Sequence, residues 1–503
     1  MKMMNSISLR FNGRNWALLI FPLVVVAVPV LLFSLWNINQ ILDFIIEFLP
    51  IWMFAALAVL LFSGYPVAFI LGGLALLFGL IGYSVGSFSL IEFFNFVPRI
   101  WGQAAENLVF VAVPTFIYMG VMMERSGVAE NLLYAVQVLL RRVPGALALA
   151  VTVMGTILAA ITGIIGASVT MMTAMALPTM LRQGYSQQLA TGCIAASGTL
   201  GILIPPSIML IVMADLLSIS VGSLFMAALG PGLALAAMYL IYISTTAALR
   251  PQMAPSLPRE LLYVPARELP RVIGLGFVPA AFLLFLVKGS ILFGWATPSE
   301  AGAVGAFGAI LLALLNRRLN YETLSGTNYT AALTIAMIFF IVMAATCFAY
   351  VFRSLGGDDV VEGLILAAGL GSWGLLFLIM AIIFLLGFFL DWIEITLIIL
   401  PIFAPMVQGF DFGDHVPVVG LGGKEVTYWF TVLIAVNLQT SFLTPPFGYA
   451  LFYMKGIAPK EVRIQNIYWG IIPFVLLQLV GLLAVMAFPQ LSLWLPGNVY
   501  GTG

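Results

Sequence analysis

Hydroxyl side chains and glycines gather beside a proline pair in a long apolar segment of this 503-residue chain. Ser168 follows Gly163 at a turn between two apolar runs, and Thr199 lies six residues before Pro205-Pro206. Hydroxyl oxygens, and carbonyls released by a helix break, suit a hard, weakly bound cation such as sodium, whereas thiolate or imidazole ligands select transition metals. The residue types therefore favour a sodium site in this segment.

A matching set of residues lies more than two hundred positions later. Pro445 follows Pro205 by 240 positions and Pro401 follows Pro178 by 223, so the two copies differ by an insertion of 17. The polar residues and glycine near the second proline pair are Gly387, Asp391, Asn437, Thr440, Ser441 and Thr444. One fold unit is therefore predicted to occur twice.

Both proline pairs predict interrupted helices at membrane depth. A proline removes a backbone donor and clashes with the carbonyl one turn earlier. Lipid cannot satisfy the released backbone groups, so such breaks persist only where they are packed in protein or line a polar cavity. Paired broken helices in corresponding positions of two halves indicate the binding site of a secondary transporter.

Two acidic residues, Asp391 and Glu394, lie within the second apolar region. They are three positions apart and therefore share one helix face. Acidic side chains at this depth are costly unless they are paired, and they are functional candidates by default. Three roles remain open: ligation of sodium, carriage of a proton, or a bond to a neighbouring span.

Composition places the chain among membrane proteins. Hydrophobic residues make up 62% and charged residues 8%, against about 25% charged in soluble domains. The formal net charge is zero, so nothing suggests nucleic acid as a partner. Cys193 and Cys347 lie in apolar segments and are expected to be core residues. His415 is the single histidine, so neither zinc chemistry nor a histidine-activated nucleophile is expected, and the chain is not predicted to be an enzyme.

The expected fold is an all-α polytopic membrane protein with two inverted repeats, each with a re-entrant helical hairpin and a broken helix. Basic residues 2, 10 and 14 precede a first apolar run that is too long for a secretory signal, so it is expected to be an anchor. The expected order is an anchor (1–48), a first half (49–248) with a hairpin near 145–181 and a broken helix near 186–219, a linker (249–272), a second half (273–490) with a hairpin near 373–406 and a broken helix near 427–455, and a tail (491–503).

Charge and amphipathicity indicate the orientation and two surface helices. Arginines concentrate at 141–142, in the linker and at 317–318, which places these segments on the cytoplasmic face by the positive-inside rule. Segments 127–142 and 356–368 have apolar residues at helical spacing opposite charged ones. Each could be an ordinary loop helix or an arm that joins a mobile domain to a fixed one.

Several motifs together resemble the large membrane subunit of tripartite ATP-independent periplasmic (TRAP) transporters, the DctM-like family. The resemblance covers about 64–490. It rests on Thr162-Gly163-Ile-Ile-Gly166-Ala167-Ser168, Leu177-Pro178-Thr-Met-Leu-Arg182-Gln-Gly184-Tyr185, Gly198-Thr199-Leu200-Gly201-Ile-Leu-Ile-Pro205-Pro206-Ser207 and Gly387-Phe-Phe-Leu-Asp391-Trp392.

The resemblance implies a sodium-coupled elevator in the bacterial inner membrane. A transport domain that holds both hairpins and both broken helices would slide against a scaffold of the remaining helices. A small four-helix membrane subunit would extend that scaffold. A periplasmic binding protein would deliver a small organic acid, such as a C4-dicarboxylate or a 2-oxo acid. Sodium would be the coupling ion, and no other cofactor is implied.

The resemblance also implies site residues. Those for sodium are Ser168, Thr199, Gly201, Pro205, Gly387, Asp391, Thr440 and Thr444. Those for the substrate, between the hairpin tips, are Ser168, Thr170, Ser207, Asn437 and Thr440.

Other functions predict different residues. A proton-coupled transporter of the same fold would use Asp391 and Glu394 as carriers. A proton-translocating subunit of a membrane complex would need a chain of buried Lys, Glu and His, and those positions are nearly empty. A passive channel would not need two hairpins with sodium-type oxygens, and an intramembrane hydrolase would need paired aspartates on two spans or a Ser-His dyad.

The insertion at 407–427 is the remaining candidate for a function. Asp411 and Asp414 lie in it among several glycines. With inverted halves it would lie on the face opposite the linker. We expect it to be either an ordinary solvent loop or part of the docking surface for the binding protein.

Overall fold

The computed structural model describes residues 38–61, 63–163, 165–256, 265, 267–388, 390–445 and 448–501, and every element in these ranges is helical. The first 37 residues of the expected anchor and residues 257–264 and 266 of the expected linker lie outside them. Seven of the helices are long and apolar enough to cross a bilayer. The prediction of an all-α membrane protein is therefore confirmed.

The first half contains α2 to α13. Their bounds are α2 Ile38–Glu47, α3 Leu49–Leu61, α4 Val67–Ser84, α5 Leu90–Phe94, α6 Phe96–Ile100, the π-helix η1 Trp101–Ala105, α7 Ala112–Arg125, α8 Val128–Leu140, α9 Ala146–Thr162, α10 Ile165–Arg182, α11 Gln187–Thr199, the 3-10 turn η2 Leu200–Ile202, α12 Ile208–Leu216 and α13 Val221–Leu249.

The second half contains α14 to α24. Their bounds are α14 Leu269–Gly276, α15 Val278–Leu292, α16 Pro298–Leu315, α17 Tyr321–Ser354, α18 Gly357–Ala367, α19 Ser372–Leu386, α20 Trp392–Gln408, the 3-10 turn η3 Gly413–His415, α21 Glu425–Leu443, α22 Tyr449–Ile457, α23 Ile464–Ala487 and α24 Gln490–Tyr500.

Two helix pairs have tight tips within apolar sequence. Helices α9 and α10 are joined at Gly163, whose φ of 62° is accessible to glycine without strain. Helices α19 and α20 are joined through the segment that begins at Gly387 and ends at Asp391. Ser168 was expected in the first tip, but it lies in the first turn of α10, because the helix already begins at Ile165.

Two other helices are interrupted at the proline pairs. Helix α11 ends at Thr199, η2 follows, and α12 begins only at Ile208. Helix α21 ends at Leu443 and α22 begins at Tyr449; Pro446 and Phe447, between them, lie outside the described residues. The interruption follows from the missing proline donors.

The two halves of the chain interlock through these elements. Helix α10 contacts α22, α12 contacts α20, and α11 contacts α21. Each hairpin therefore packs against the helix that follows the break in the other half of the sequence. Segments from both halves consequently surround the two breaks.

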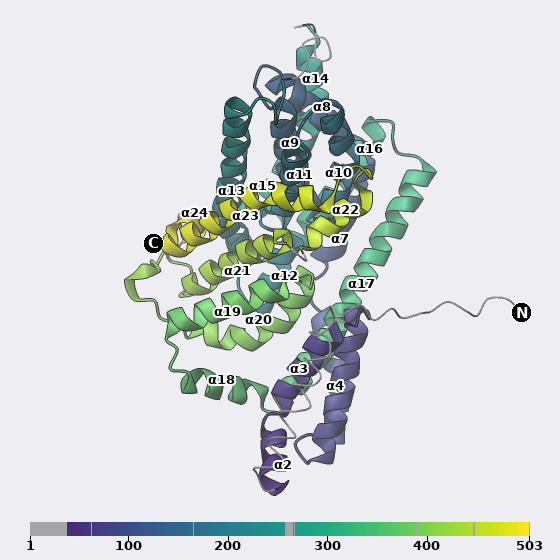
Figure 1. Ribbon diagram of the computed structural model, residues 1–503. Coiled ribbons are helices and arrows are strands. Elements are labelled where there is room, and N and C mark those ends of the chain that lie inside the picture. Colours follow the sequence, from purple (N-terminus) through teal and green to yellow (C-terminus); the bar gives the residue numbers. More distant parts are fainter. Residues whose placement is uncertain are drawn as a thin grey trace, which may run out of the picture.

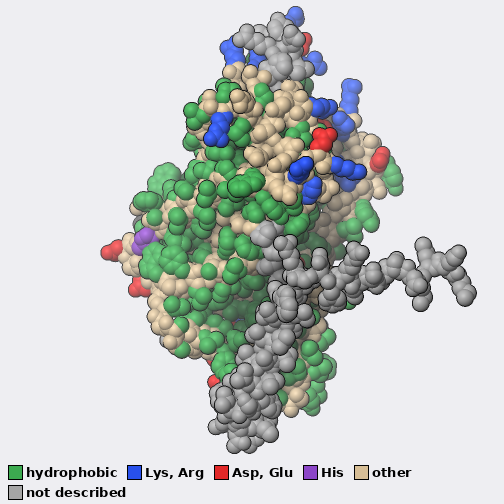
Figure 2. Space-filling view, viewed as in Figure 1, with side chains coloured by type: hydrophobic (Ala, Val, Ile, Leu, Met, Phe, Trp, Pro, Cys, Tyr) green, Lys and Arg blue, Asp and Glu red, His purple; other side chains and the backbone are tan. Residues whose placement is uncertain are grey.

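The molecule has one basic end and a broad apolar surface. Figure 1 places α8 and α14 at one end of the molecule and α2 and α18 at the other. Figure 2 shows lysine and arginine side chains gathered toward the end with α8 and α14, whereas hydrophobic side chains dominate the rest of this face. This distribution is the one that the positive-inside rule describes.

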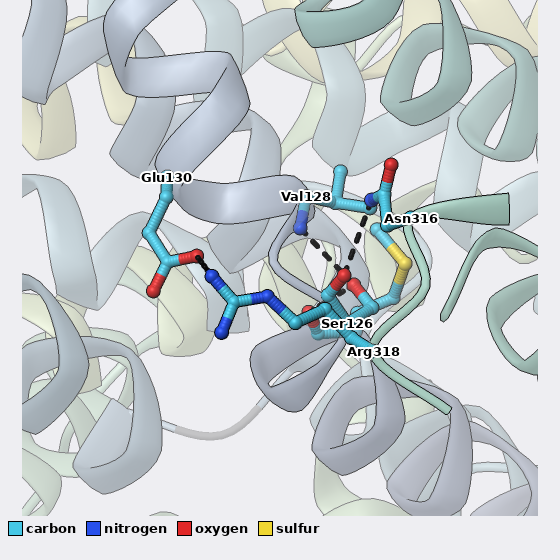
Figure 3. A network of polar contacts seen from close by, with 6 residues as sticks. Ser126, Val128, Glu130, Asn316 and Arg318 are labelled. Atoms are coloured by element: carbon cyan, nitrogen blue, oxygen red, sulfur yellow. Dashed lines mark hydrogen bonds and ion pairs between the residues drawn. The ribbon is translucent and has the colours of Figure 1, made fainter. Parts of the chain in front are cut away.

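A polar network fixes the start of α8 at the basic end (Figure 3). Asn316 Nδ2 donates to the carbonyl of Ser126 at 3.1 Å, and the backbone N–H of Val128 donates to Ser126 Oγ at 3.2 Å. Arg318 lies 3.8 Å from Glu130 in an exposed ion pair. These contacts join the α7–α8 turn to the α16–α17 turn. One face of α8 is buried against the protein, so α8 is amphipathic as predicted.

The structure differs from the sequence prediction in three places. Segment 90–105, for which no element was predicted, forms α5, α6 and η1. Helix α14 begins at Leu269, inside the expected linker. The expected tail contains α24, because Ser492, Leu493 and Pro496 are buried and the helix packs on α13.

Candidate functional site

The first hairpin tip lies against the start of α12. A Cβ added to Gly163 would lie 3.4 Å from the backbone nitrogen of Ile208. Ser168, one turn into α10, is only 1% exposed. The tip and the helix that follows the first break therefore form one packed unit.

Ser207 closes the first break. Its hydroxyl donates to the carbonyl of Ile202 at 2.7 Å and accepts from the backbone N–H of Leu210 at 3.5 Å. It is thus the N-cap of α12 and satisfies one group on each side of the break. Ser207 was predicted to bind substrate, and that role stays a prediction beside its capping role.

Thr199, at the end of α11, contacts Gln439 of α21. Its hydroxyl donates to the carbonyl of Ala196 at 2.9 Å and accepts from Gln439 Nε2 at 3.5 Å. Gln439 is fully buried, and its Oε1 has no hydrogen-bond partner among the described residues. A buried carbonyl oxygen without a partner costs about 1–3 kcal/mol, and a cation or a water would remove this cost.

The predicted threonines of α21 bond back to their own helix. Thr440 Oγ1 donates to the carbonyl of Val436 at 2.8 Å, and Thr444 Oγ1 donates to the carbonyl of Thr440 at 2.8 Å. Such bonds are usual for hydroxyls in helices. They orient the hydroxyl oxygen, whose lone pairs remain available to a cation.

The second tip packs closely on α21. A Cβ added to Gly387 would overlap Oγ of Ser441, so only glycine fits at this position. Asn437 Nδ2 donates to the carbonyl of Met380, in α19, at 2.7 Å. Its amide nitrogen thus ties α21 to the hairpin, and the predicted role of Asn437 in substrate binding stays a prediction.

Asp391 and Glu394 form a capping box at the start of α20. Asp391 Oδ1 accepts from the backbone N–H of Trp392 at 2.8 Å, and Glu394 Oε2 accepts from the backbone N–H of Asp391 at 3.2 Å. In the described part of the chain, neither carboxylate has a lysine or arginine within ion-pair distance. Each thus bonds to its own helix end through one oxygen.

A tyrosine pair on α22 connects the two tips. Tyr453 donates to the Tyr449 hydroxyl oxygen at 3.0 Å. A Cβ on Gly166 would lie 3.0 Å from the Tyr453 ring, and the Tyr449 hydroxyl interacts electrostatically with Asp391 and Glu394. No aromatic residue was predicted at this site, although the spacing of four residues just after a proline break could have indicated the pair.

A cavity of about 480 Å³ lies away from the predicted site residues, none of which line it. Its polar lining includes Arg99, Asp215 and Arg353. The sequence analysis did not assign a role to these three residues, which come from separate segments. At the tips and breaks the structure brings Gly163 to the start of α12, Thr199 to Gln439, and Gly387 to Ser441.

Comparisons with known proteins agree on one family. The family model described as "Tripartite ATP-independent periplasmic transporter, DctM component" matches residues 54–491. The C4-dicarboxylate TRAP transporter large permease protein DctM of Pseudomonas aeruginosa is 29% identical over 400 residues, which cover 78% of this chain and 87% of that protein.

Two further relatives are named for other compounds. The 2,3-diketo-L-gulonate large permease YiaN of Escherichia coli is 27% identical over 439 residues, covering 86% of this chain and 97% of that one. The ectoine/5-hydroxyectoine large permease UehC of Ruegeria pomeroyi is 29% identical over 386 residues, covering 76% and 85%. Among solved structures, the YdaH transporter of Alcanivorax borkumensis has a TM-score of 0.55 at 14% identity, covering 81% of this chain and 89% of that one, which indicates a shared fold.

Proposed function

Because the chain belongs to the DctM component family of tripartite ATP-independent periplasmic transporters, we propose that it is the large permease of a sodium-coupled uptake system for a small organic acid. The observation that carries this proposal is the contact between the two interrupted helices at Thr199 and Gln439. A buried carbonyl oxygen without a partner, next to oriented hydroxyls, is chemistry suited to a hard cation.

We propose two sodium sites. The first would use hydroxyls of Ser168 and Thr199 and the side-chain carbonyl of Gln439, with backbone carbonyls near Gly201 and Pro205. The second would use Thr440 and Thr444 with the tip at Gly387 and Asp391. Support for both comes from the burial of Ser168, Thr199 and Thr440 and from the helix breaks.

The substrate class is a small carboxylate. Relatives are named for C4-dicarboxylates and 2,3-diketo-L-gulonate. The α12 amino end lies beside the first tip, and helix amino ends attract anions. We propose that the carboxylate binds between the two tips, close to Ser168, Thr170 and the tyrosine pair Tyr449 and Tyr453.

The mechanism we propose is an elevator in the bacterial inner membrane. The hairpins and broken helices would move together, since α10 contacts α22 and α12 contacts α20. The remaining long helices would form the scaffold, and a small four-helix subunit would pack on its apolar surface. The basic end with α8 and α14 would face the cytoplasm.

Substrate capture would come from a periplasmic binding protein. Asp411 and Asp414 are exposed in the inserted segment 407–427, and the end of the segment is fixed by Lys424, whose Nζ donates to the carbonyl of Ser218 at 2.6 Å. We propose this segment as part of the docking surface. Its charge reversal, Asp411→Lys with Asp414→Lys, should impair delivery by the binding protein.

Uptake into proteoliposomes tests the function. The permease is reconstituted with its small subunit and binding protein, and uptake is measured under an inward sodium gradient or under a pH gradient in sodium-free buffer. We expect uptake only with sodium and only with the binding protein. Equal uptake on the pH gradient in sodium-free buffer would show that transport is coupled to protons and not to sodium. Uptake of free substrate without the binding protein would overturn the tripartite assignment.

A further inference from the structure

The cavity of about 480 Å³ lies between α17 and elements of the candidate transport domain. One wall is α17, with Thr346 and Tyr350, and the other comprises the end of α12 and the middle of α20. Its volume is within the range of sites for small ligands. A ligand here would touch both the long helix and the elements proposed to move.

Two guanidinium groups face this cavity. Arg99 lies over the ring of Tyr350, 4.4 Å from its centroid, and no carboxylate lies within ion-pair distance of it in the described part of the chain. Arg353 donates to the carbonyl of Pro401 at 2.5 Å and pairs with Asp358 at 3.6 Å. Both arginines are therefore held in place, and Arg99 keeps an uncompensated charge for an anion.

A carboxylate lines the same cavity. Asp215 Oδ2 accepts from Asn107 Nδ2 at 2.8 Å and from Gln103 Nε2 at 3.2 Å. Neutral amides, rather than cations, thus hold Asp215, so its negative charge is not neutralised by a described residue. Its second oxygen, Oδ1, makes neither of these bonds and can accept from a ligand.

We propose that this cavity is an entry site for a monocarboxylate that carries a hydroxyl or ammonium group. The carboxylate would bind at Arg99 and Arg353, and the donor group at Asp215. A second carboxylate at the far end of the ligand would meet the negative charge of Asp215, so dicarboxylates should bind less well. The proposal rests on the proposed function in assuming an organic-acid substrate, and it narrows the substrate class.

Cysteine labelling tests the cavity without requiring transport. Thr346→Cys is introduced and labelled in detergent with an anionic reagent, 2-sulfonatoethyl methanethiosulfonate, or a cationic one, 2-(trimethylammonium)ethyl methanethiosulfonate. The unchanged protein gives the baseline, because Cys193 and Cys347 are buried. Ser63→Cys, on the exposed turn between α3 and α4, is the control outside the cavity.

We expect the anionic reagent to label Thr346→Cys several-fold faster than the cationic one, relative to the control, and Arg99→Gln to reduce this preference. Lactate should slow labelling more than propionate, which lacks the hydroxyl, and more than succinate. In the Asp215→Asn background, succinate should slow labelling to nearly the same extent as lactate. If Thr346→Cys does not fold, Ala349→Cys, one turn later on the same wall, replaces it.

Three results would overturn the proposal. These are no charge preference beyond that of Ser63→Cys, no protection by lactate, or protection by succinate equal to that by lactate in the unmutated background. The labelling outcome is separate from uptake, because it needs no sodium gradient and no binding protein. If sodium-driven uptake fails while lactate still protects Thr346→Cys from labelling, the proposed function is rejected and the ligand site in the cavity is supported.

Discussion

Gln439 Nε2 lies 3.5 Å from Oγ1 of Thr199, and the two residues are 240 positions apart in the sequence. The same offset separates Pro205 from Pro445. Residues that correspond in the two copies of the motif therefore touch each other. Such a contact is possible only close to the axis that would relate the two copies, so it locates the crossing of the two interrupted helices.

The first prediction concerns the partnerless oxygen of Gln439. Gln439→Met keeps an unbranched chain of similar shape and removes the buried carbonyl. Without sodium, we expect Tm to be unchanged or higher, because the cost of about 1–3 kcal/mol for an unsatisfied group disappears. Sodium should raise the Tm of the unchanged protein, and this increase should be much smaller in Gln439→Met. An equal sodium-induced increase in both proteins would show that Gln439 is not a ligand.

The second prediction concerns Ser168. Ser168→Ala removes one proposed coordinating oxygen, and we expect the sodium concentration for half-maximal uptake to rise about tenfold, equivalent to about 1.4 kcal/mol. Ser244→Ala on α13 is the matched control, since its hydroxyl donates to the carbonyl of Leu240 outside the site. An unchanged sodium dependence in Ser168→Ala would remove this residue from the site.

The third prediction concerns the contact between Gly387 and Ser441. Gly387→Ala should displace the second tip and abolish most uptake, because the new Cβ would overlap the Ser441 hydroxyl. The double variant Gly387→Ala with Ser441→Gly should recover part of the uptake. Gly73→Ala in α4, where nothing lies within 4 Å of the new Cβ, should be neutral. Full activity of Gly387→Ala would show that the tip does not need this close contact.

The sequence predicts the helical class and the helix interruptions because both depend on local chemistry. A proline pair lacks two backbone donors in any tertiary context, and a glycine such as Gly163 tolerates the turn of a hairpin. The roles of Ser207 and Asn437 could not be predicted in this way. Their hydroxyl and amide groups are suitable ligands by type, but their partners, Ile202 and Met380, are set by packing.

The residues that the sequence did not indicate depend on long-range contacts. The guanidinium of Arg99 and the carboxylate of Asp215 belong to separate segments and share a cavity only through the arrangement of α6, α12 and α17. Gln439 is different, since the 240-residue offset from Thr199 was available in the sequence. Adding 240 to position 199 indicates Gln439, which was not among the predicted site residues.

The last prediction separates the roles of Asp391 and Glu394. As a capping box, the pair stabilises the start of α20 by accepting backbone hydrogen bonds. Asparagine also caps helices well and glutamine also completes the box. We therefore expect Asp391→Asn and Glu394→Gln to keep most of the stability and of the maximal sodium-driven uptake, with a weaker sodium dependence in Asp391→Asn, because Asp391 belongs to the proposed second sodium site. Asp391→Ala should lose about 1 kcal/mol of stability, measured as a lower Tm.

A proton-carrying role predicts the opposite result for the amide variants, because neither asparagine nor glutamine can take up or release a proton at physiological pH. Uptake is measured for Asp391→Asn and Glu394→Gln at fixed sodium gradient between about pH 6 and pH 8, with Asp391→Ala as the variant that lacks the cap. Loss of uptake in both amide variants at unchanged Tm would show that capping is not the only role of the pair, and it would favour proton carriage. An unchanged sodium dependence in Asp391→Asn would remove the Asp391 carboxylate from the proposed second sodium site, because the amide keeps the cap but lacks the negative charge.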